Sequence, residues 1–448
     1  MLILADDMGY GDFGCFNDGA SQTPTLDHLV DDSVCLTQHY SASPVCAPAR
    51  ASLLTGRYPQ RTGAIDTLEH RGLDRIALGE QTLGDVLQRA GYVTALVGKW
   101  HNGAFDGRFH PNRRGFDEFA GFSGGWSDYW TWRLDRNGQV SESDGRYLTD
   151  VLTEEAIAFI RRHRREPFFL FLAYSAPHYP FQAPDEDITP FRETGRFTSG
   201  VSAIYGMLRA MDRGIAAVLD EVDDDTLVMF SSDNGPQFSG EGDYSTTRFN
   251  CGYRGAKGSV YEGGVRLPMV VRWPNGIDRR DSVDALVHFT DWLPTLAAAA
   301  GAVVPEVVLD GVNVLPLLQG EAAQVPDVRF WQWNRYQPVA HSNAAMRDGR
   351  WKLVRPAIAT TMHVTPADLA IDIDSKNRPE AYADILRASE PPGDIGPSLP
   401  AQLFDIDADP GEAHDLAAVE PARVARMDAE LSTWFAAVEA DRVRIADS

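Results

Sequence analysis

The chain has 448 residues, of which 44% are hydrophobic, and this length predicts two or three domains, or one large domain with a smaller appendage. Its 41 basic and 64 acidic side chains give a formal net charge of −23, which argues against nucleic acid or an anionic membrane as the main partner. An anionic substrate would therefore need a local cluster of positive charge.

The first predicted element is a buried strand at residues 2–5, and another buried strand is predicted at residues 226–231. Each runs into carboxylate or amide side chains, which places these groups at the carboxyl ends of strands, where ligands bind in open α/β sheets. Their oxygens are hard ligands that suit Ca²⁺ or Mg²⁺ rather than Zn²⁺. Each pair alone is more often a turn or a helix cap, so the metal hypothesis depends on both pairs. The candidate ligands are Asp6, Asp7, Asp233 and Asn234.

Cys46 begins the sequence Cys-Ala-Pro-Ala-Arg, which continues as Ala-Ser-Leu-Leu-Thr-Gly-Arg. A thiolate nucleophile needs a nearby base, and a zinc site needs C-x-x-C or histidine spacing. Neither pattern surrounds this residue. The other cysteines, Cys15, Cys35 and Cys251, form no disulfide pattern and are interpreted as small buried side chains.

Lysines and histidines follow the strands predicted at residues 93–97 and 168–174, and a further lysine lies in a glycine-rich loop. A lone lysine or histidine usually marks a solvated surface or a satisfied hydrogen bond. Strand ends and glycine-rich loops, however, are where the sites of such sheets are built. We therefore treat Lys99, His101, His178 and Lys257 as candidate site residues.

Helical periodicity alternates with these strands along residues 1–326. The alternation predicts an α/β fold with a large, mainly parallel (mixed) sheet sandwiched by helices. The helices are predicted at residues 82–90, 149–163, 205–222 and 290–300, with a further strand at residues 267–273.

The Cys-x-Pro-x-Arg run at residues 46–50 and the Gly-Lys-Trp-His sequence at residues 98–101 resemble motifs of the type I (formylglycine-dependent) sulfatase family, in the alkaline phosphatase superfamily. In that family a formylglycine-generating maturation enzyme oxidises the cysteine, and the hydrate of the resulting aldehyde is the nucleophile. The resemblance implies the same modification of Cys46. Two positions depart from the commoner residues, with Ala49 in place of serine and Asn102 in place of leucine.

The resemblance also implies a reaction, the hydrolysis of a sulfate monoester. The hydrate would attack sulfur while basic side chains and the metal hold the sulfuryl oxygens. His178, with Lys257, would protonate the leaving alcohol, and His101 would act as a base when sulfate is expelled. The metal is expected to be Ca²⁺, with Mg²⁺ as the alternative, held by Asp6, Asp7, the modified Cys46, Asp233 and Asn234. The implied catalytic residues are Cys46, Arg50, Lys99, His101, His178 and Lys257.

Residues 327–448 differ in sequence pattern from the residues before them and resemble the C-terminal subdomain of sulfatases. This subdomain would complete the pocket rim beside a catalytic domain at residues 1–326. The resemblance implies a small antiparallel sheet and a closing helix, here at residues 422–440. A turn between strands is predicted within residues 344–354, and a further strand begins at residue 402. Residues 356–400 are rich in proline, aspartate and alanine and are predicted to form an irregular insertion.

Aromatic and arginine side chains gather in two segments, around residues 126–132 and 331–336. Aromatic rings in loops suit the apolar faces of sugars, and arginine suits a carboxylate or a second sulfate. For any single tryptophan, core packing is the commoner explanation. As a set they favour a sulfated saccharide over a small aryl ester as the substrate. The candidate substrate-binding residues are Trp126, Tyr129, Trp130, Trp333 and Arg335.

Two other functions remain open. A phosphodiester or phosphonate ester hydrolase would use the same aldehyde and metal, because tetrahedral anions are similar. A non-catalytic protein that binds sulfated glycans would keep the pocket if Cys46 were never oxidised. The sugar, its sulfate position and the oligomeric state are not predicted.

The sequence contains no transmembrane run and no signal peptide, and it starts inside the first predicted strand, so its N-terminus looks truncated. A soluble protein is expected. Related bacterial enzymes are often periplasmic or secreted, so the compartment is left open.

Overall fold

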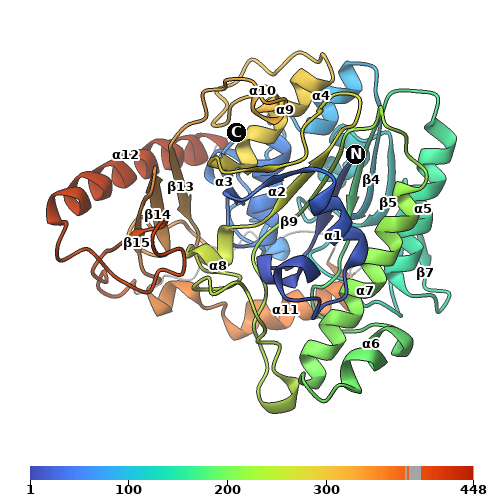
Figure 1. The fold of residues 1–448 in the computed structure, drawn as a ribbon, viewed down its shortest axis with the longest axis horizontal. Coiled ribbons are helices and arrows are strands. Elements are labelled where there is room, and N and C mark those ends of the chain that lie inside the picture. The colour runs from blue at the N-terminus through green and yellow to red at the C-terminus, as the bar shows by residue number, and fades with distance from the viewer. Residues whose placement is uncertain (379–380, 383–394, 447–448) are drawn as a thin grey trace.

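The computed structural model describes residues 1–378, 381–382 and 395–446. A ten-stranded sheet forms the centre of the molecule, and a separate four-stranded sheet lies beside it with the long helix α12 (Pro421–Ala446), at the left of Figure 1. The ten strands follow the order β11-β2-β10-β9-β1-β8-β4-β5-β6-β7. Their bounds are β1 Leu2–Ala5, β2 Val34–Leu36, β4 Val93–Lys99, β5 Glu118–Phe122, β6 Arg133–Arg136, β7 Gln139–Glu142, β8 Phe168–Ala173, β9 Val228–Ser232, β10 Met269–Arg272 and β11 Ser282–Val283.

The five central strands β9, β1, β8, β4 and β5 are all parallel, whereas β10, β6 and β7 pair in antiparallel fashion nearer the edges. The predicted mainly parallel, mixed α/β sheet is therefore confirmed. The register pairs Ala5 with Ser232 and Leu4 with Ala173. Because parallel strands in this register end together, the residues that follow β1, β8 and β9 meet at one edge.

Helices cover both faces of the sheet (Figure 1). Alternate residues of β1 enter two different cores, with Ile3 packing toward α5 and α7 and Leu4 packing toward α2, α4 and α9. Helix α7 begins earlier than the predicted residue 205. The α-helix bounds of this part are α1 Pro24–Asp31, α2 Cys46–Thr55, α3 Pro59–Thr62, α4 Leu83–Arg89, α5 Leu148–His163, α6 Asp185–Arg192, α7 Ser199–Leu219, α8 Glu262–Val265, α9 Trp292–Ala299 and α10 Leu315–Leu318.

The second sheet is antiparallel, in the order β13-β14-β15-β16, and α12 packs its apolar face against it through Met427, Leu431 and Trp434. This confirms the small antiparallel sheet and closing helix, although the helix is longer than predicted. The predicted domain boundary at residues 326 and 327 stays a prediction. The bounds are β13 Val328–Gln332, β14 Ala344–Asp348, β15 Trp351–Arg355, β16 Gln402–Asp405 and α12 Pro421–Ala446.

The expectation of an irregular insertion at residues 356–400 is wrong for its first half. This segment contains a 3₁₀ turn and helix α11 (Pro366–Asn377). Thr365 caps the helix by accepting a hydrogen bond from the Asp368 N–H, and Pro366 occupies its first turn, both standard start signals that composition alone concealed. Residues 379–380 and 383–394 of the predicted insertion lie outside the described residues.

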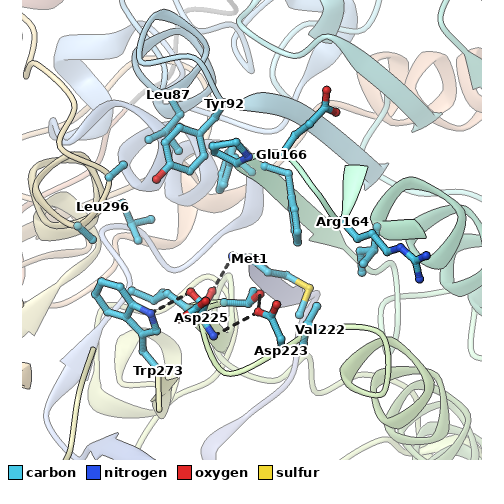
Figure 2. A pocket seen from close by; sticks show the side chains of 18 of the residues that line it. Met1, Leu87, Tyr92, Arg164, Glu166, Val222, Asp223, Asp225, Trp273 and Leu296 are labelled. Atoms are coloured by element: carbon cyan, nitrogen blue, oxygen red, sulfur yellow. Dashed lines mark hydrogen bonds between the residues drawn. The ribbon is translucent and has the colours of Figure 1, made fainter. Parts of the chain in front are cut away.

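At the amino ends of the central strands lies a cavity of about 370 Å³, lined by Met1, Tyr92, Trp273 and Leu296 among others (Figure 2). The candidate site residues lie at the opposite edge of the same sheet. Among the residues described, no helix combines the length and the apolar character needed to cross a membrane.

Candidate active site

The acidic residues predicted to bind a metal lie together where β1 and β9 end. The Asp233 N–H donates to the Ala5 carbonyl at 3.1 Å, and the Asp7 N–H donates to Asp233 Oδ1 at 3.2 Å. Asn234 Nδ2 donates to Asp7 Oδ1 at 2.8 Å. Asp7 has a φ of 65°, in the left-handed region that side chains other than glycine rarely adopt. Such strain is typical of functional sites, where the surrounding structure holds it in place.

Cys46 occupies the first position of α2, so its side chain lies at the positive end of the helix dipole. The residue is buried, and ligand atoms of Asp6, Asp7, Cys46 and His178 all lie within 4.8 Å of one another. Burial raises the pKa of the Cys46 thiol above its usual value, despite the opposing effect of Lys257 and Lys99. The thiol is therefore a poor source of thiolate, which argues against direct cysteine catalysis.

Each carboxylate of this cluster is paired with a different cation. Lys99 Nζ lies 2.6 Å from Asp6 Oδ2, and Lys257 Nζ lies 2.7 Å from Asp7 Oδ2. Arg50 Nε donates to Asp233 Oδ2 at 2.9 Å, and Arg50 Nη1 donates to the Lys99 carbonyl at 3.1 Å. Three cations thus converge on one buried point of a chain whose net charge is −23.

The Gly-Lys-Trp-His segment owes its position to Gly98. This glycine has a φ of 107°, and a Cβ added to it would lie 1.9 Å from the Ala173 carbonyl oxygen of the neighbouring strand β8. Only glycine permits this close approach of β4 and β8. The approach brings Lys99 and His101 to the same edge as His178, which follows β8.

The two histidines are held by backbone carbonyls. His178 Nδ1 lies 2.6 Å from the Tyr179 carbonyl, and its Nε2 lies 3.7 Å from Asp7 Oδ2. A carbonyl only accepts hydrogen bonds, so Nδ1 carries a proton and Nε2 faces the site. His101 Nε2 lies 3.4 Å from the Thr67 carbonyl. Burial lowers the pKa of both imidazoles well below the usual value, and neighbouring lysines add to this effect.

The donor set fits a hard divalent cation. Within the described chain, Asp6 Oδ1 and Asn234 Oδ1 are buried and accept no hydrogen bond. Burial and the repulsion of Asp233 raise the pKa of Asp6 to about 8. Buried oxygens of this kind suit a cation that offsets their charge and takes their free lone pairs.

The family comparisons agree with this geometry. The profile described as Sulfatase matches residues 1–302, and the profile described as N-sulphoglucosamine sulphohydrolase, C-terminal, matches residues 255–378. The chain belongs to the sulfatase family.

Individual relatives align with most of the length of this sulfatase. N-acetylgalactosamine-6-sulfatase from Homo sapiens is 35% identical over 364 residues, which cover 73% of this chain and 67% of the relative. Arylsulfatase A from Bos taurus is 32% identical over 454 residues, which cover 93% and 82%. The crystal structure of Ps i-CgsB in complex with k-i-k-neocarrahexaose matches with a TM-score of 0.79 at 30% identity, covering 97% and 91%. The chain is thus a sulfuric ester hydrolase.

Beside the charged cluster, this sulfatase has a cleft of about 610 Å³. Of the predicted substrate-binding residues, Trp126 lines it and contacts Tyr179 with ring centroids 6.0 Å apart. Asp128 and Gln182 line it too, joined by a hydrogen bond of 2.9 Å. Aromatic rings with polar neighbours are what a sugar ring requires.

The other predicted substrate-binding residues do not line this cleft. Tyr129 is fully buried, and its hydroxyl donates to the His178 carbonyl at 3.0 Å, so it supports the histidine loop rather than an exposed wall. Trp130 packs on Tyr147 with centroids 5.2 Å apart. Trp333 is buried beside Gly258, with Arg335 over its ring at 5.0 Å.

Sequence reasoning missed two charged residues next to His101, namely Glu69 and Lys376. They form a buried ion pair between the 3₁₀ turn η3 (Glu69–Arg71) and α11. Neither follows a strand, and the two are 307 positions apart in the chain. No local pattern could have joined them. Tyr179, Gln182 and Asp128 were missed as well, although Tyr179 directly follows the predicted His178.

Proposed function

We propose that this sulfatase hydrolyses a sulfate monoester of a carbohydrate to an alcohol and inorganic sulfate, with a formylglycine formed at Cys46. The observation that carries the proposal is the burial of Cys46 at the start of α2, among the carboxylates Asp6 and Asp7 and the cations of Lys99 and Lys257. A buried thiol with a raised pKa has little use as a nucleophile. The same position suits an aldehyde, which needs no ionisation.

Two groups would complete the site. When present, the formylglycine hydrate supplies the attacking hydroxyl, and a divalent cation neutralises charge on the sulfate and lowers the barrier to attack. Residue 46 would share the cation with the strand-end ligands, and we expect Ca²⁺, with Mg²⁺ as the alternative. The strand-end ligands are Asp6, Asp7, Asp233 and Asn234.

The basic side chains bind and orient the sulfate group. Lys99, Lys257 and Arg50 carry fixed positive charge within a buried site, where such charge stabilises the transition state far more than in water. Their pairing with carboxylates fixes their positions before substrate arrives. The start of α2 adds its partial positive charge.

The histidines move protons. His178 Nε2 faces the site and can pass a proton to the leaving alcohol, with Lys257 beside it, while the Asp7 carboxylate at 3.7 Å partly offsets the burial that lowers the pKa of this ring. His101 has a buried Nδ1 that, in the described structure, has no hydrogen-bond partner. This nitrogen is suited to accept a proton when sulfate departs.

The cleft lined by Trp126, Tyr179, Asp128 and Gln182 supports a saccharide as the leaving group. Its polar groups can bond sugar hydroxyls, and its rings can cover an apolar sugar face. Ps i-CgsB, the neighbour matched at 30% identity, is complexed with k-i-k-neocarrahexaose. Sulfated oligosaccharides are therefore the first substrates to assay, compared with an aryl sulfate.

The test combines mass spectrometry of the Cys46 peptide from the natural host with an aryl sulfate assay on the same sample. We expect an aldehyde at Cys46, sulfate release, and loss of turnover in Cys46→Ser without loss of folding. Aryl phosphodiester and phosphonate esters serve as matched substrates, and a strong preference for them would overturn the proposal. An unmodified thiol and no turnover, in a host whose maturation enzyme processes other sulfatases, would instead favour a glycan-binding protein.

A further inference from the structure

Lysine is rare in this chain, and its few positions are informative. Only four of the 41 basic side chains are lysines, namely Lys99, Lys257, Lys352 and Lys376. All four pair with buried carboxylates, and the most exposed of them, Lys257, has an exposed fraction of 18%. Lysine is almost never fully buried unless it is paired, so the ammonium group at each of these positions offsets the charge of a buried carboxylate. Lys99 and Lys257 do so in the sulfate site.

Lys376 lies next to that site. Its Nζ contacts Glu69 Oε1, and the same oxygen accepts a hydrogen bond from the Gly125 N–H. Glu69 Oε1 also lies 3.6 Å from His101 Nε2. Thus α11, from the C-terminal part of the chain, reaches the imidazole through one shared carboxylate. The Lys376 side chain is 7% exposed and that of Glu69 is 1% exposed, so little water reaches the contact.

This arrangement determines which nitrogen of His101 carries the proton. The Thr67 carbonyl, 3.4 Å from Nε2, can only accept a hydrogen bond. An ionised Glu69 can also only accept. Both neighbours therefore favour the tautomer with a proton on Nε2, which leaves the lone pair on Nδ1. Nδ1 is the buried nitrogen that has no partner among the described residues.

The ionised state of Glu69 depends on Lys376. Burial raises the pKa of Glu69, and Lys376 is the main group that opposes this rise. Without the ammonium, a protonated Glu69 could donate its own O–H to His101 Nε2. The imidazole would then carry its proton on Nδ1, and this nitrogen would no longer be a base.

We propose that Lys376 is a positioning residue, which keeps Glu69 as a carboxylate so that Glu69 holds His101 in the Nε2–H tautomer with Nδ1 free to accept a proton. The inference rests on the proposed function only in giving His101 the role of a base. The pairing itself exists whether or not Cys46 is modified. A purely structural ion pair would tie α11 to η3 but would have no effect on the His101 tautomer.

The first experiment needs no maturation and no substrate. Long-range ¹H–¹⁵N spectra of ¹⁵N-histidine-labelled protein, unmodified at Cys46, report the tautomer of each imidazole, and His101→Gln identifies the His101 signals. We expect the Nε2–H tautomer in the wild type and a populated Nδ1–H tautomer in Lys376→Met. Arg378→Met is the matched control, because Arg378 pairs with Asp374 near the same end of α11 and does so at the surface. This control should keep the wild-type tautomer.

The second experiment uses the mature enzyme and an aryl sulfate. Lys376→Met should lower kcat by roughly 10–100-fold, less than the loss of a general base itself because His101 is still present, with KM changed by less than about threefold. Lys376→Arg should recover most of kcat, since a guanidinium also keeps Glu69 ionised. Glu69→Gln removes the carboxylate without removing Lys376 and should lower kcat similarly.

The outcomes separate the two proposals. A wild-type His101 tautomer in Lys376→Met, or a kcat equal to that of Arg378→Met, overturns the positioning role. If Lys376→Met does not fold, an unchanged tautomer and unchanged kcat in Glu69→Gln overturn it instead. A tautomer change in a protein that hydrolyses no sulfate ester would uphold the positioning of His101 while the proposed function fails.

Discussion

The two edges of the central sheet contain very different cavities, although the same strands form both. At the amino ends of β1, β8 and β9 lies the cavity of about 370 Å³ shown in Figure 2, lined by Tyr92, Trp273 and Leu296. At the carboxyl ends lies a cluster of buried carboxylates, lysines and histidines beside an open cleft. The cavity at the amino ends offers space for a ligand, whereas the site at the carboxyl ends also offers charged groups that can react with one.

The difference lies in the polar groups that each edge leaves unsatisfied. At the amino edge, Trp273 Nε1 donates to the Asp225 carbonyl at 3.0 Å, and Asn275 Nδ2 donates to Asp225 Oδ1 at 2.6 Å. At the carboxyl edge, Asp6 Oδ1, Asn234 Oδ1 and His101 Nδ1 are buried without hydrogen-bond partners in the described part of the chain. Buried polar atoms are nearly always bonded, so these atoms mark the edge that needs a ligand.

The largest expected effect comes from breaking the charged edge. Asp233→Asn keeps the shape of the side chain but removes the charge that binds Arg50 and supports the metal site. We expect kcat/KM for an aryl sulfate to fall by at least about 100-fold and Ca²⁺ affinity to weaken, as for other lost electrostatic groups in active sites. Kinetics and calorimetric titration with Ca²⁺ measure both. Asp225→Asn at the amino edge is the matched control, and equal losses in the two variants would refute the distinction between the edges.

Metal removal should be the next largest effect. Chelation leaves the carboxylates of Asp6, Asp7 and Asp233 crowded, so Tm should fall and recover when Ca²⁺ is restored. At a Ca²⁺ concentration of 100 times Kd, one site adds about 2.7 kcal/mol of stability. Asp6→Asn replaces one carboxylate ligand and the buried partner of Lys99, so Ca²⁺ should raise the Tm of this variant less than that of the wild type. Equal Tm values with and without Ca²⁺ in the wild type would contradict the metal site.

A substitution in the cleft should weaken binding of the saccharide rather than of the sulfate group. Trp126→Ala removes a ring that lines the cleft against Tyr179, and we expect KM for a sulfated oligosaccharide to rise about tenfold, equivalent to about 1.4 kcal/mol. An aryl sulfate should be affected much less. Trp130→Ala is the control, because that ring packs on Tyr147 outside the cleft lining. If KM rose equally for both substrates, Trp126 would act in folding rather than in binding the saccharide.

Sequence reasoning found the strand-end residues because parallel strands in register bring distant segments to one edge. Asp6, Lys99, His178 and Asp233 each follow a strand whose apolar run is easy to recognise, and the structure brings them together as expected. Their catalytic roles stay proposals. Helix α2 was not predicted as a helix, because all of its residues are buried and a helix that is buried all round has no amphipathic periodicity.

The remaining differences arise from tertiary contacts. Strands β5, β6 and β7 extend the sheet on either side of the aromatic segment at residues 126–132, which was interpreted only as a pocket wall or as core packing. Strand β7 is mostly exposed and has no apolar run. The pairing of Glu69 with Lys376 depends on how α11 docks against η3. No sequence spacing contains that information. The side chains that shape specificity are therefore less predictable than those that perform the chemistry.

The smallest effect on turnover is expected for Asp74, whose titration changes stability instead. This residue is buried behind the active site and accepts a hydrogen bond from the Gly103 N–H at 2.9 Å. Burial, together with the repulsion of Glu69, raises the pKa of Asp74 to about 7, whereas an unfolded aspartate titrates near about 4. A raised pKa in the folded state means that this carboxyl favours folding when protonated, and that its contribution is lost as pH rises toward and through 7. Asp74→Asn has no such titration.

Urea unfolding at pH 5 and pH 8 tests this sign. We expect the free energy of unfolding of Asp74→Asn, relative to wild type, to be higher at pH 8 than at pH 5 by roughly 2–3 kcal/mol. Other titrating groups are common to both proteins and cancel in the difference. A pH-independent difference for Asp74→Asn would mean that the pKa of Asp74 is not raised in the folded protein. The buried negative charge of the active site would then not act on this carboxyl.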